Sequence, residues 1–474
     1  DSRMSTPILF GTDGWRAIIG EEFTFANVRR VSAAVADYAL SCTKSPLIVV
    51  GYDTRFLSGS FARSVAETLT HYGCRVILSN KVVSTPALSS ATVSHRAFGG
   101  VMISASHNPA FFNGFKYKTS SGSSAPEAIT GRFEKFLQQT LPTVPVVHND
   151  ICFADFSSSY FKRLSSVVDL PLIRKSSVSI VADPLYGAGM GYLQSIIGRA
   201  KPIVTEIHGH PDPLFGGLHP EPIDHVLGDL KKAVRKQRAH AGLATDGDAD
   251  RIGVVDDRGR YLTPHQVFPL LLHYLCSCKG MRGKVVQSIS LGYLSERIAR
   301  DYNLPFEEVS VGFKHIANRI MDQNPELPVL MGGEESGGYG YGNYLPERDG
   351  ILNSLMIIEM LASTGKTLSR LLKDLEKKYG ASCYLRTDIP NPGIPKSDFV
   401  KEIKNHIPAV IGGLKVVAVK DYDGIEFVLS DDSWLLLRPS GTEPMIRVYA
   451  ETGSEEKTKN LILWGKKIVN NCIQ

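Results

Sequence analysis

A short apolar strand leads directly into an acidic loop in Gly242-Leu243-Ala244-Thr245-Asp246-Gly247-Asp248-Ala249-Asp250-Arg251. Three carboxylates stand at alternate positions with small residues between them, so one tight turn can bring them together. Hydrophobic residues resume at once in Ile252–Val255, which predicts a second strand. The stretch therefore predicts a sheet whose strand ends carry the functional groups.

The same arrangement occurs twice more along the chain. A strand at Val101–Ile103 leads into Ser104–Pro109, and a strand at Pro328–Met331 leads into Gly332–Gly338. Further strands are predicted at 47–50, 75–78, 178–182, 203–207 and 284–287, with a helix over 60–71. Strand, helix and strand at this spacing indicate largely parallel sheets covered by helices, which bind ligands beyond the carboxyl ends of their strands.

The tail after Gly380 has a different pattern. Three prolines between 390 and 395 precede a predicted helix over 397–406, several strands and a final helix near 455–470. A chain of 474 residues also exceeds what one hydrophobic core supports. We predict an α/β protein with four domains, at residues 1–150, 151–258, 259–379 and 380–474, the last a smaller α+β domain.

Asp246, Asp248 and Asp250 are the strongest candidates for a metal site. Crowded carboxylates repel one another, and a hard cation such as Mg²⁺ bound to a phosphate would compensate. An EF-hand is excluded because position twelve of the loop is Asp257 and a strand begins at Ile252. An acidic surface turn is the alternative. Arg251 is placed to touch a phosphate.

Ser106 follows a buried strand and could present its hydroxyl in a cleft, although an ordinary turn would have a similar sequence. Lys116 returns toward the same loop. A lysine desolvated beside cations can have a lowered pKa and act as acid or base, whereas a surface lysine is the plainer interpretation.

Two further loops offer groups for an anion and for hydroxyls. Arg438, two hydroxyls and Gly441 in the stretch 438–444 form a phosphate cradle that has neither a base nor a nucleophile. Glu334 and Ser336 offer a carboxylate and a hydroxyl to neighbouring sugar hydroxyls, although this signal is weak in isolation.

Composition excludes several classes of protein. The net charge is only +5, and the basic run from Lys231 to Arg238 fits a solvated helix face better than a nucleic-acid patch. Seven cysteines without framework spacing indicate reduced thiols in a cytoplasmic protein. We expect no membrane span and no signal peptide.

These motifs together resemble the α-D-phosphohexomutase family, from Phe10–Arg16 to Arg438–Pro444. The resemblance implies three related mixed-sheet α/β domains and a smaller fourth around a central cleft. It implies a phosphoserine at Ser106, with Arg16, His107 and Lys116 as catalytic residues. The residues implied in binding the metal are Ser106, Asp246, Asp248 and Asp250. Those implied in binding substrate are Arg251, Lys314, Glu334, Ser336, Arg438, Ser440, Gly441, Thr442 and Arg447.

One departure from the family pattern lies in the loop Gly332–Gly338, which carries Glu334 and Ser336. Some bacterial members have a histidine two residues after the loop serine, where this chain has Gly338, so no histidine role is transferred. The form of this loop leans toward phosphoglucomutase-like members.

The resemblance implies interconversion of hexose 1-phosphate and hexose 6-phosphate, of glucose or mannose or both. Mg²⁺ would be the cofactor and hexose 1,6-bisphosphate the intermediate and activator. A phosphoglucosamine mutase, a metal-dependent sugar phosphatase and a non-catalytic homologue are alternatives. The expected partner is a small sugar phosphate, with no nucleic acid or membrane, and the expected state is a monomer or homodimer. All of this requires the four loops to meet in one pocket.

Overall fold

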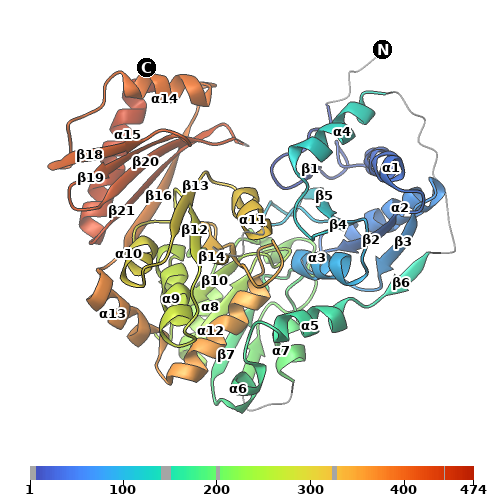
Figure 1. The fold of residues 1–474 in the computed structure, drawn as a ribbon, viewed down its shortest axis with the longest axis horizontal. Coiled ribbons are helices and arrows are strands. Elements are labelled where there is room, and N and C mark those ends of the chain that lie inside the picture. The colour runs from blue at the N-terminus through green and yellow to red at the C-terminus, as the bar shows by residue number, and fades with distance from the viewer. Residues whose placement is uncertain (1–6, 140–150, 199–202, 323–327, 442, 474) are drawn as a thin grey trace.

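The computed structural model describes residues 7–139, 151–198, 203–322, 328–441 and 443–473. Within these ranges the chain forms four sheets in sequence order, each with its own helices (Figure 1). The first and fourth units lie at opposite ends of the view, and the second and third lie between them. No helix in the described part of the chain is long and apolar enough to cross a membrane.

The first sheet has the strand order β1-β5-β4-β2-β3-β6. Its central strands β2, β3, β4 and the edge strand β6 run parallel, whereas β5 is antiparallel to β4 and β1. The strands are β1 (Trp15–Ile18), β2 (Leu47–Tyr52), β3 (Arg75–Ser79), β4 (Gly99–Ile103), β5 (Phe112–Thr119) and β6 (Cys152–Ala154). The helices are α1 (Phe25–Cys42), α2 (Ser58–His71), α3 (Thr85–Ser94) and α4 (Glu127–Leu137). Because β6 pairs with β3, this sheet extends slightly past the predicted boundary at residue 150.

The second sheet has the order β11-β10-β9-β7-β8, with β7 parallel to β8 and β9. Its strands are β7 (Ser179–Asp183), β8 (Ile203–Glu206), β9 (Ala241–Thr245), β10 (Ile252–Val255) and β11 (Tyr261–Leu262). The helices are α5 (Ser157–Ser165), α6 (Leu170–Lys175), α7 (Tyr192–Ile197), the 3₁₀ turn η1 (Phe215–Gly217) and α8 (Gly228–Gln237). The basic run predicted on a helix lies on α8, except Arg238, which follows the helix end.

The third sheet has the order β13-β12-β14-β15, with β12 parallel to β13 and β14. Its strands are β12 (Lys284–Ser288), β13 (Phe306–Val309), β14 (Val329–Gly333) and β15 (Tyr339–Tyr341). The helices are α9 (Pro264–Ser277), α10 (Leu294–Asp301), α11 (Phe313–Met321), α12 (Gly350–Thr364) and α13 (Leu368–Tyr379).

The three α/β units share one topological feature. In each, a buried parallel strand is joined by a short loop to an antiparallel neighbour, as β4 to β5, β9 to β10 and β14 to β15. These three connections are the serine loop after β4, which carries Ser106, the acidic loop after β9, which carries the three aspartates, and the sugar loop after β14, which carries Glu334 and Ser336. The sheets are therefore mixed, because the functional loop of each unit reverses the chain, and the expectation of largely parallel sheets holds only for their centres.

The fourth sheet is entirely antiparallel, with the order β16-β21-β20-β19-β18-β17. Its strands are β16 (Cys383–Pro390), β17 (Val410–Ile411), β18 (Leu414–Lys420), β19 (Ile425–Leu429), β20 (Trp434–Pro439) and β21 (Met445–Thr452). The helices α14 (Lys396–Lys404) and α15 (Glu455–Ile473) confirm the two helices predicted in this tail. The fold class predicted from the sequence is confirmed.

The hydrophobic cores explain how the units are held together. One continuous cluster includes Met102 of the first unit, Leu243 of the second and Leu355 of the third. The fourth unit has its own core between its sheet and its helices. Trp434, Leu436 and Tyr449, with the partly buried Tyr384, join the large cluster from the other face of its sheet. The first unit also has a separate core on the other face of its sheet. The large cluster therefore joins the first three units, and the fourth packs against them through one face of its sheet.

Candidate active site

Ser106 lies three residues beyond the end of β4 and is only 1% exposed. Its φ of +52° is left-handed, a conformation that costs a residue with a β-carbon roughly 1–3 kcal/mol. The backbone N–H of Ser106 donates to Ser104 Oγ at 2.9 Å, and its own Oγ donates to Asp246 Oδ2 at 3.0 Å. The serine of the first unit therefore contacts the acidic loop of the second.

The acidic loop folds around its own first aspartate. Asp246 Oδ1 accepts the backbone N–H groups of Asp250 at 3.0 Å and Arg251 at 3.1 Å. Asp246, Asp248 and Asp250 are fully buried, and each offers an oxygen within 4.8 Å of the others. Gly247 permits the loop to approach the serine, since a Cβ there would lie 2.3 Å from the Ser106 carbonyl oxygen. An exposed acidic turn, the alternative interpretation, is wrong.

The three carboxylates have oxygens that no neighbouring donor among the described residues satisfies. Asp248 Oδ2 accepts Thr85 Oγ1 and Lys116 Nζ, both at 2.6 Å. Asp248 Oδ1 and Asp250 Oδ1 are buried without a hydrogen-bond donor within the described residues. Burial and the charges of Asp250 and Asp248 raise the pKa of Asp246 well above its usual value. Such a set of oxygen ligands fits a hard divalent cation.

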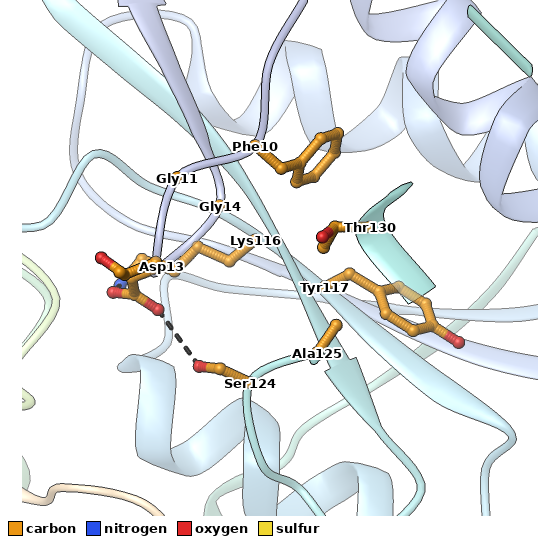
Figure 2. A pocket seen from close by; sticks show the side chains of 10 residues that line it. Phe10, Gly11, Asp13, Gly14, Lys116, Tyr117, Ser124, Ala125 and Thr130 are labelled. Atoms are coloured by element: carbon orange, nitrogen blue, oxygen red, sulfur yellow. Dashed lines mark hydrogen bonds and ion pairs between the residues drawn. The ribbon is translucent and has the colours of Figure 1, made fainter. Parts of the chain in front are cut away.

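Lys116 lies among carboxylates rather than among cations. Its Nζ is 2.8 Å from Asp13 Oδ2, 2.6 Å from Asp248 Oδ2 and 3.8 Å from Asp250 Oδ2. Figure 2 shows Lys116 and Asp13 meeting beside a small pocket, with the other oxygen of Asp13 directed to Ser124. Burial lowers the pKa of Lys116, but the three carboxylates outweigh burial and raise it overall. The lowered pKa considered from the sequence is therefore wrong.

Arginines and a histidine surround the serine loop. Arg16 donates from Nη1 to Asn108 Oδ1 at 2.7 Å, and its Nη2 lies 3.3 Å from Asp13. The Nδ1 of His107 is buried without a partner within the described ranges. Burial and the charges of Arg251 and Arg16 hold the pKa of His107 well below its usual value, so it is neutral at pH 7. Arg16 and Arg251 give the serine loop positive neighbours suited to an anion, and His107 adds no charge.

The sugar loop packs directly against the acidic loop. The backbone N–H of Ile252 donates to the Gly337 carbonyl at 3.0 Å. Glu334 is 4% exposed, and its Oε1 accepts the backbone N–H of Gly312 at 2.8 Å. Ser336 Oγ is buried without a hydrogen-bond partner among the described residues. One carboxylate and one hydroxyl thus lie at adjacent positions of a short loop.

The phosphate loop is the predicted stretch 438–444 of the fourth unit. One aspartate, Asp423, connects it to the third unit. Asp423 Oδ1 accepts Arg438 Nε at 2.9 Å, and Asp423 Oδ2 accepts the backbone N–H of Val311 at 2.7 Å. Burial raises the pKa of Asp423, but Arg438 and Lys396 outweigh it and lower the pKa overall. The residue ties the fourth unit to the loop that also contacts Glu334.

The tip of the phosphate loop is open. Ser440 Oγ accepts the backbone N–H of Glu443 at 3.3 Å, and Gly441 is exposed with no atom within 4 Å of a Cβ placed there. Arg447 pairs with Glu443 at 2.6 Å. Thr442 lies outside the described residues.

Contacts therefore link all four loops, from Ser106 through the acidic and sugar loops to Arg438. Four domain families match the chain in the same order. They are described as phosphoglucomutase/phosphomannomutase alpha/beta/alpha domains I, II and III, at residues 7–141, 158–259 and 263–379, and the C-terminal domain at 396–462. The chain belongs to the phosphoglucomutase/phosphomannomutase family. The family predicted from the motifs is confirmed.

Individual relatives of this phosphohexomutase cover nearly its full length. A phosphoglucomutase/phosphomannomutase of Thermococcus kodakarensis is 30% identical over 98% of this chain and 99% of the relative. A phosphoglucosamine/phosphogalactosamine mutase of Sulfurisphaera tokodaii is 32% identical over 97% of this chain and 99% of the relative. The solved structure of a protein from Thermus thermophilus, described as a phosphomannomutase, superposes with a TM-score of 0.86 at 33% identity, covering 98% and 100% of the two chains. The family is one of isomerases, and this chain is an enzyme of that class.

Two charged residues of the phosphohexomutase site had no predicted role. Asp13 contacts Lys116, and Arg348, which is 8% exposed on its side chain, lies 3.0 Å from Asp250 and 3.3 Å from Asp13. A Cβ on Gly338 would lie 2.4 Å from Arg348 Cδ, so the arginine fills the space beside the position where some members have histidine. The sequence signal for Arg348 was the charged run 347–349 between a strand and an apolar helix.

Lys314 is the predicted site residue that the structure does not join to the others. It is exposed near the start of α11, and no hydrogen bond or ion pair links it to the described part of the site. Arg251 is placed between the loops, 3.8 Å from Glu221, with its Nε buried and unpaired among the described residues.

Proposed function

We propose that this enzyme interconverts the 1-phosphate and 6-phosphate of glucose, mannose or both, through a phosphoserine at Ser106 and a hexose 1,6-bisphosphate. The proposal depends on one observation, the 3.0 Å contact between Ser106 Oγ and Asp246 within a buried acidic triad. A serine hydroxyl held beside a cation site has the arrangement that phosphoryl transfer requires, since that reaction depends on positioning and charge neutralisation.

Mg²⁺ is the cofactor that these residues fit. Asp246, Asp248 and Asp250 would hold it together with the oxygen of Ser106, and the unpaired oxygens of Asp248 and Asp250 support this choice. When bound, the ion would neutralise negative charge on the phosphoryl group.

The chain's own residues would position the reactants. We assign Lys116 to proton transfer at the sugar hydroxyl as the acid, because the carboxylates that raise its pKa keep it protonated, 2.6 Å from Asp248. Arg16 and His107 would bind the oxygens of the phosphoserine, and Arg251 those of the substrate. Lys314, which is exposed, would reach a ligand only from the edge of the site.

The non-reacting end of the substrate would be held in the fourth unit. Arg438, Ser440, Gly441, Thr442 and Arg447 would bind its phosphate, and Glu334 with Ser336 would bind sugar hydroxyls. A bisphosphorylated sugar must bind in two opposite orientations. Glu334 and Ser336 must therefore accept the sugar hydroxyls in both orientations while one phosphate is bound in the fourth unit. We also propose a cytoplasmic location, consistent with seven free cysteines.

A phosphoglucosamine mutase is the second candidate, because relatives with that activity in their names match as well as the phosphoglucomutases do. Glucose, mannose and glucosamine 1-phosphates, each assayed with a catalytic amount of the matching bisphosphate, separate these candidates. Release of inorganic phosphate instead of the isomeric ester would identify a phosphatase and contradict the proposal.

Ser106→Ala tests the proposed nucleophile. We expect it to abolish turnover and the gain of one phosphoryl mass, while calorimetry still detects binding of sugar phosphate. Ser45→Ala, at an exposed serine of the same unit, is the control and should retain activity. Unchanged mutase activity in Ser106→Ala would refute the assignment.

A further inference from the structure

One buried arginine outside the predicted site binds the backbone of the serine loop. The guanidinium of Arg55 donates from Nη2 to the carbonyl oxygens of Ser106 at 2.6 Å and Asn108 at 2.7 Å. Its Nη1 donates to the carbonyl oxygens of Pro109 at 2.8 Å and Phe112 at 3.0 Å. Every one of these acceptors lies within six residues of the proposed nucleophile.

The surroundings of Arg55 fix its direction. Its side chain and that of Asp53 are both 0% exposed and form an ion pair at 3.4 Å. The guanidinium carbon lies 5.0 Å from the ring centroid of Phe215, which belongs to the second unit. A buried guanidinium needs such partners, because its charge is otherwise costly to remove from water. Arg55 therefore cannot turn away from the loop.

The carbonyls that converge on Arg55 would repel one another without a cation. Their negative ends point to one spot, and a positive charge with several N–H donors satisfies them together. The left-handed φ of Ser106 also needs support from its surroundings, since this conformation is unfavourable for serine. Arg55 supplies that support from one side of the Ser106 carbonyl, and Gly247 packs against the same oxygen.

The orientation of one peptide unit follows. The described chain contains no cis peptide bond, so the N–H of His107 points away from the Ser106 carbonyl and hence away from Arg55. No hydrogen bond to that N–H is found within the described residues. A donor held in this way is available to the oxygens of a phosphoryl group on the serine loop.

We propose that Arg55 is a positioning residue for phosphoryl transfer: by binding the carbonyl groups of the serine loop it holds Ser106 Oγ against the acidic triad. This inference rests on the proposed phosphoserine mechanism. Loss of the guanidinium leaves buried carbonyls without donors, and the loop relaxes to regain them. A displacement of about 1 Å at the nucleophile can reduce the rate about 100-fold.

The test compares Arg55→Met and Arg55→Lys with Arg30→Met. Arg30 also donates to a carbonyl in the first unit, that of Leu137 at 2.9 Å, but lies outside the site. The rate of phosphoserine formation from glucose 1,6-bisphosphate, or from mannose 1,6-bisphosphate, is measured by intact mass. kcat, KM and the melting temperature are measured alongside.

We expect Arg55→Met to slow loading and kcat by about 100-fold. KM should change less than about threefold, because the guanidinium contacts the serine loop and none of the described residues assigned to the non-reacting phosphate. Arg55→Lys, which retains the charge but fewer donors, should recover part of the loss, and Arg30→Met should match the wild type. A purely structural role would reduce activity only in proportion to the unfolded fraction, and that result overturns the proposal.

Further outcomes remain decisive. If Arg55→Met fails to fold, Arg55→Lys alone decides. Phosphoserine formation in Arg55→Lys at the wild-type rate then overturns the proposal. If the wild-type protein itself never acquires a phosphoryl group, the proposed function fails rather than the role of Arg55. If the wild type and Arg55→Met load equally fast, the proposed function stands and the role of Arg55 is wrong.

Discussion

The serine loop and the phosphate loop differ in how far they are assembled without a ligand. Around Ser106, groups from two units already touch, and the three aspartates are fully buried. In the phosphate loop Gly441 and Glu443 are exposed, and Arg438 is joined to the third unit through Asp423. One region is built for fixed geometry, and the other is accessible to solvent.

This difference matches the two tasks that the proposed reaction sets. Charge neutralisation is most effective where polar groups are oriented in advance in a site that excludes water. A grip for the non-reacting phosphate must instead admit and release a ligand, and elements that move are those with few buried contacts. The following three predictions test this contrast.

Asp248→Asn should have the largest effect, because it acts on the assembled region. Asp248 contacts Lys116 and Thr85, and its other oxygen is free for a cation. We expect turnover to fall about 1,000-fold. Mn²⁺ binding, measured by calorimetry, should weaken more than about 100-fold, since even outer partners of a metal site cost about 10- to 100-fold.

The control for this variant is Asp229→Asn, which alters a side chain that is 62% exposed in the same unit. It should leave both measurements unchanged. Metal affinity that survives Asp248→Asn would contradict the assignment of the triad and would remove the basis for treating this region as the reactive one.

The sequence was sufficient to predict the functional residues at strand ends, but not the long-range partners that these residues contact. Ser106, Asp246 and Glu334 follow apolar strands, so their common edge could be predicted from local pattern. The contact of Arg348 with Asp13 spans 335 positions, and no local pattern indicates it. The direction of the Lys116 pKa depended on such partners too, because a lysine among carboxylates and one among cations have the same local sequence.

The second prediction concerns Glu451, where the fourth unit contacts the third. Glu451 is fully buried on β21 and accepts Trp434 Nε1 at 2.6 Å and the backbone N–H of Tyr293, in the third unit, at 3.1 Å. Burial raises its pKa from 4.5 to about 7, while hydrogen bonds and Arg297 oppose the shift. The protonated form is thus favoured on folding.

The sign of the pH effect follows from this shift. The stability that Glu451 contributes is fully present below pH 4.5 and is lost as the pH rises to about 7. Between pH 5 and pH 8, the free energy of unfolding of the wild type should fall by about 2–3 kcal/mol relative to Glu451→Gln. Urea unfolding of both proteins at the two pH values measures this. A difference that does not vary with pH would mean that Glu451 is ionised throughout.

Asp423→Asn should have the smallest effect and bears most directly on the contrast between the two regions. It keeps an acceptor for Val311 but weakens a charged hydrogen bond to Arg438, worth about 1.5–3 kcal/mol. We therefore expect KM for the sugar phosphate to rise about 10-fold with kcat nearly unchanged. Asp421→Asn, which removes only a surface pair with Lys404, is the matched control. Hydrolysis of the preformed phosphoserine, which needs no phosphate grip, should proceed at the wild-type rate. A fall in that rate would mean that the fourth unit orders the serine loop, and the two regions would then be one.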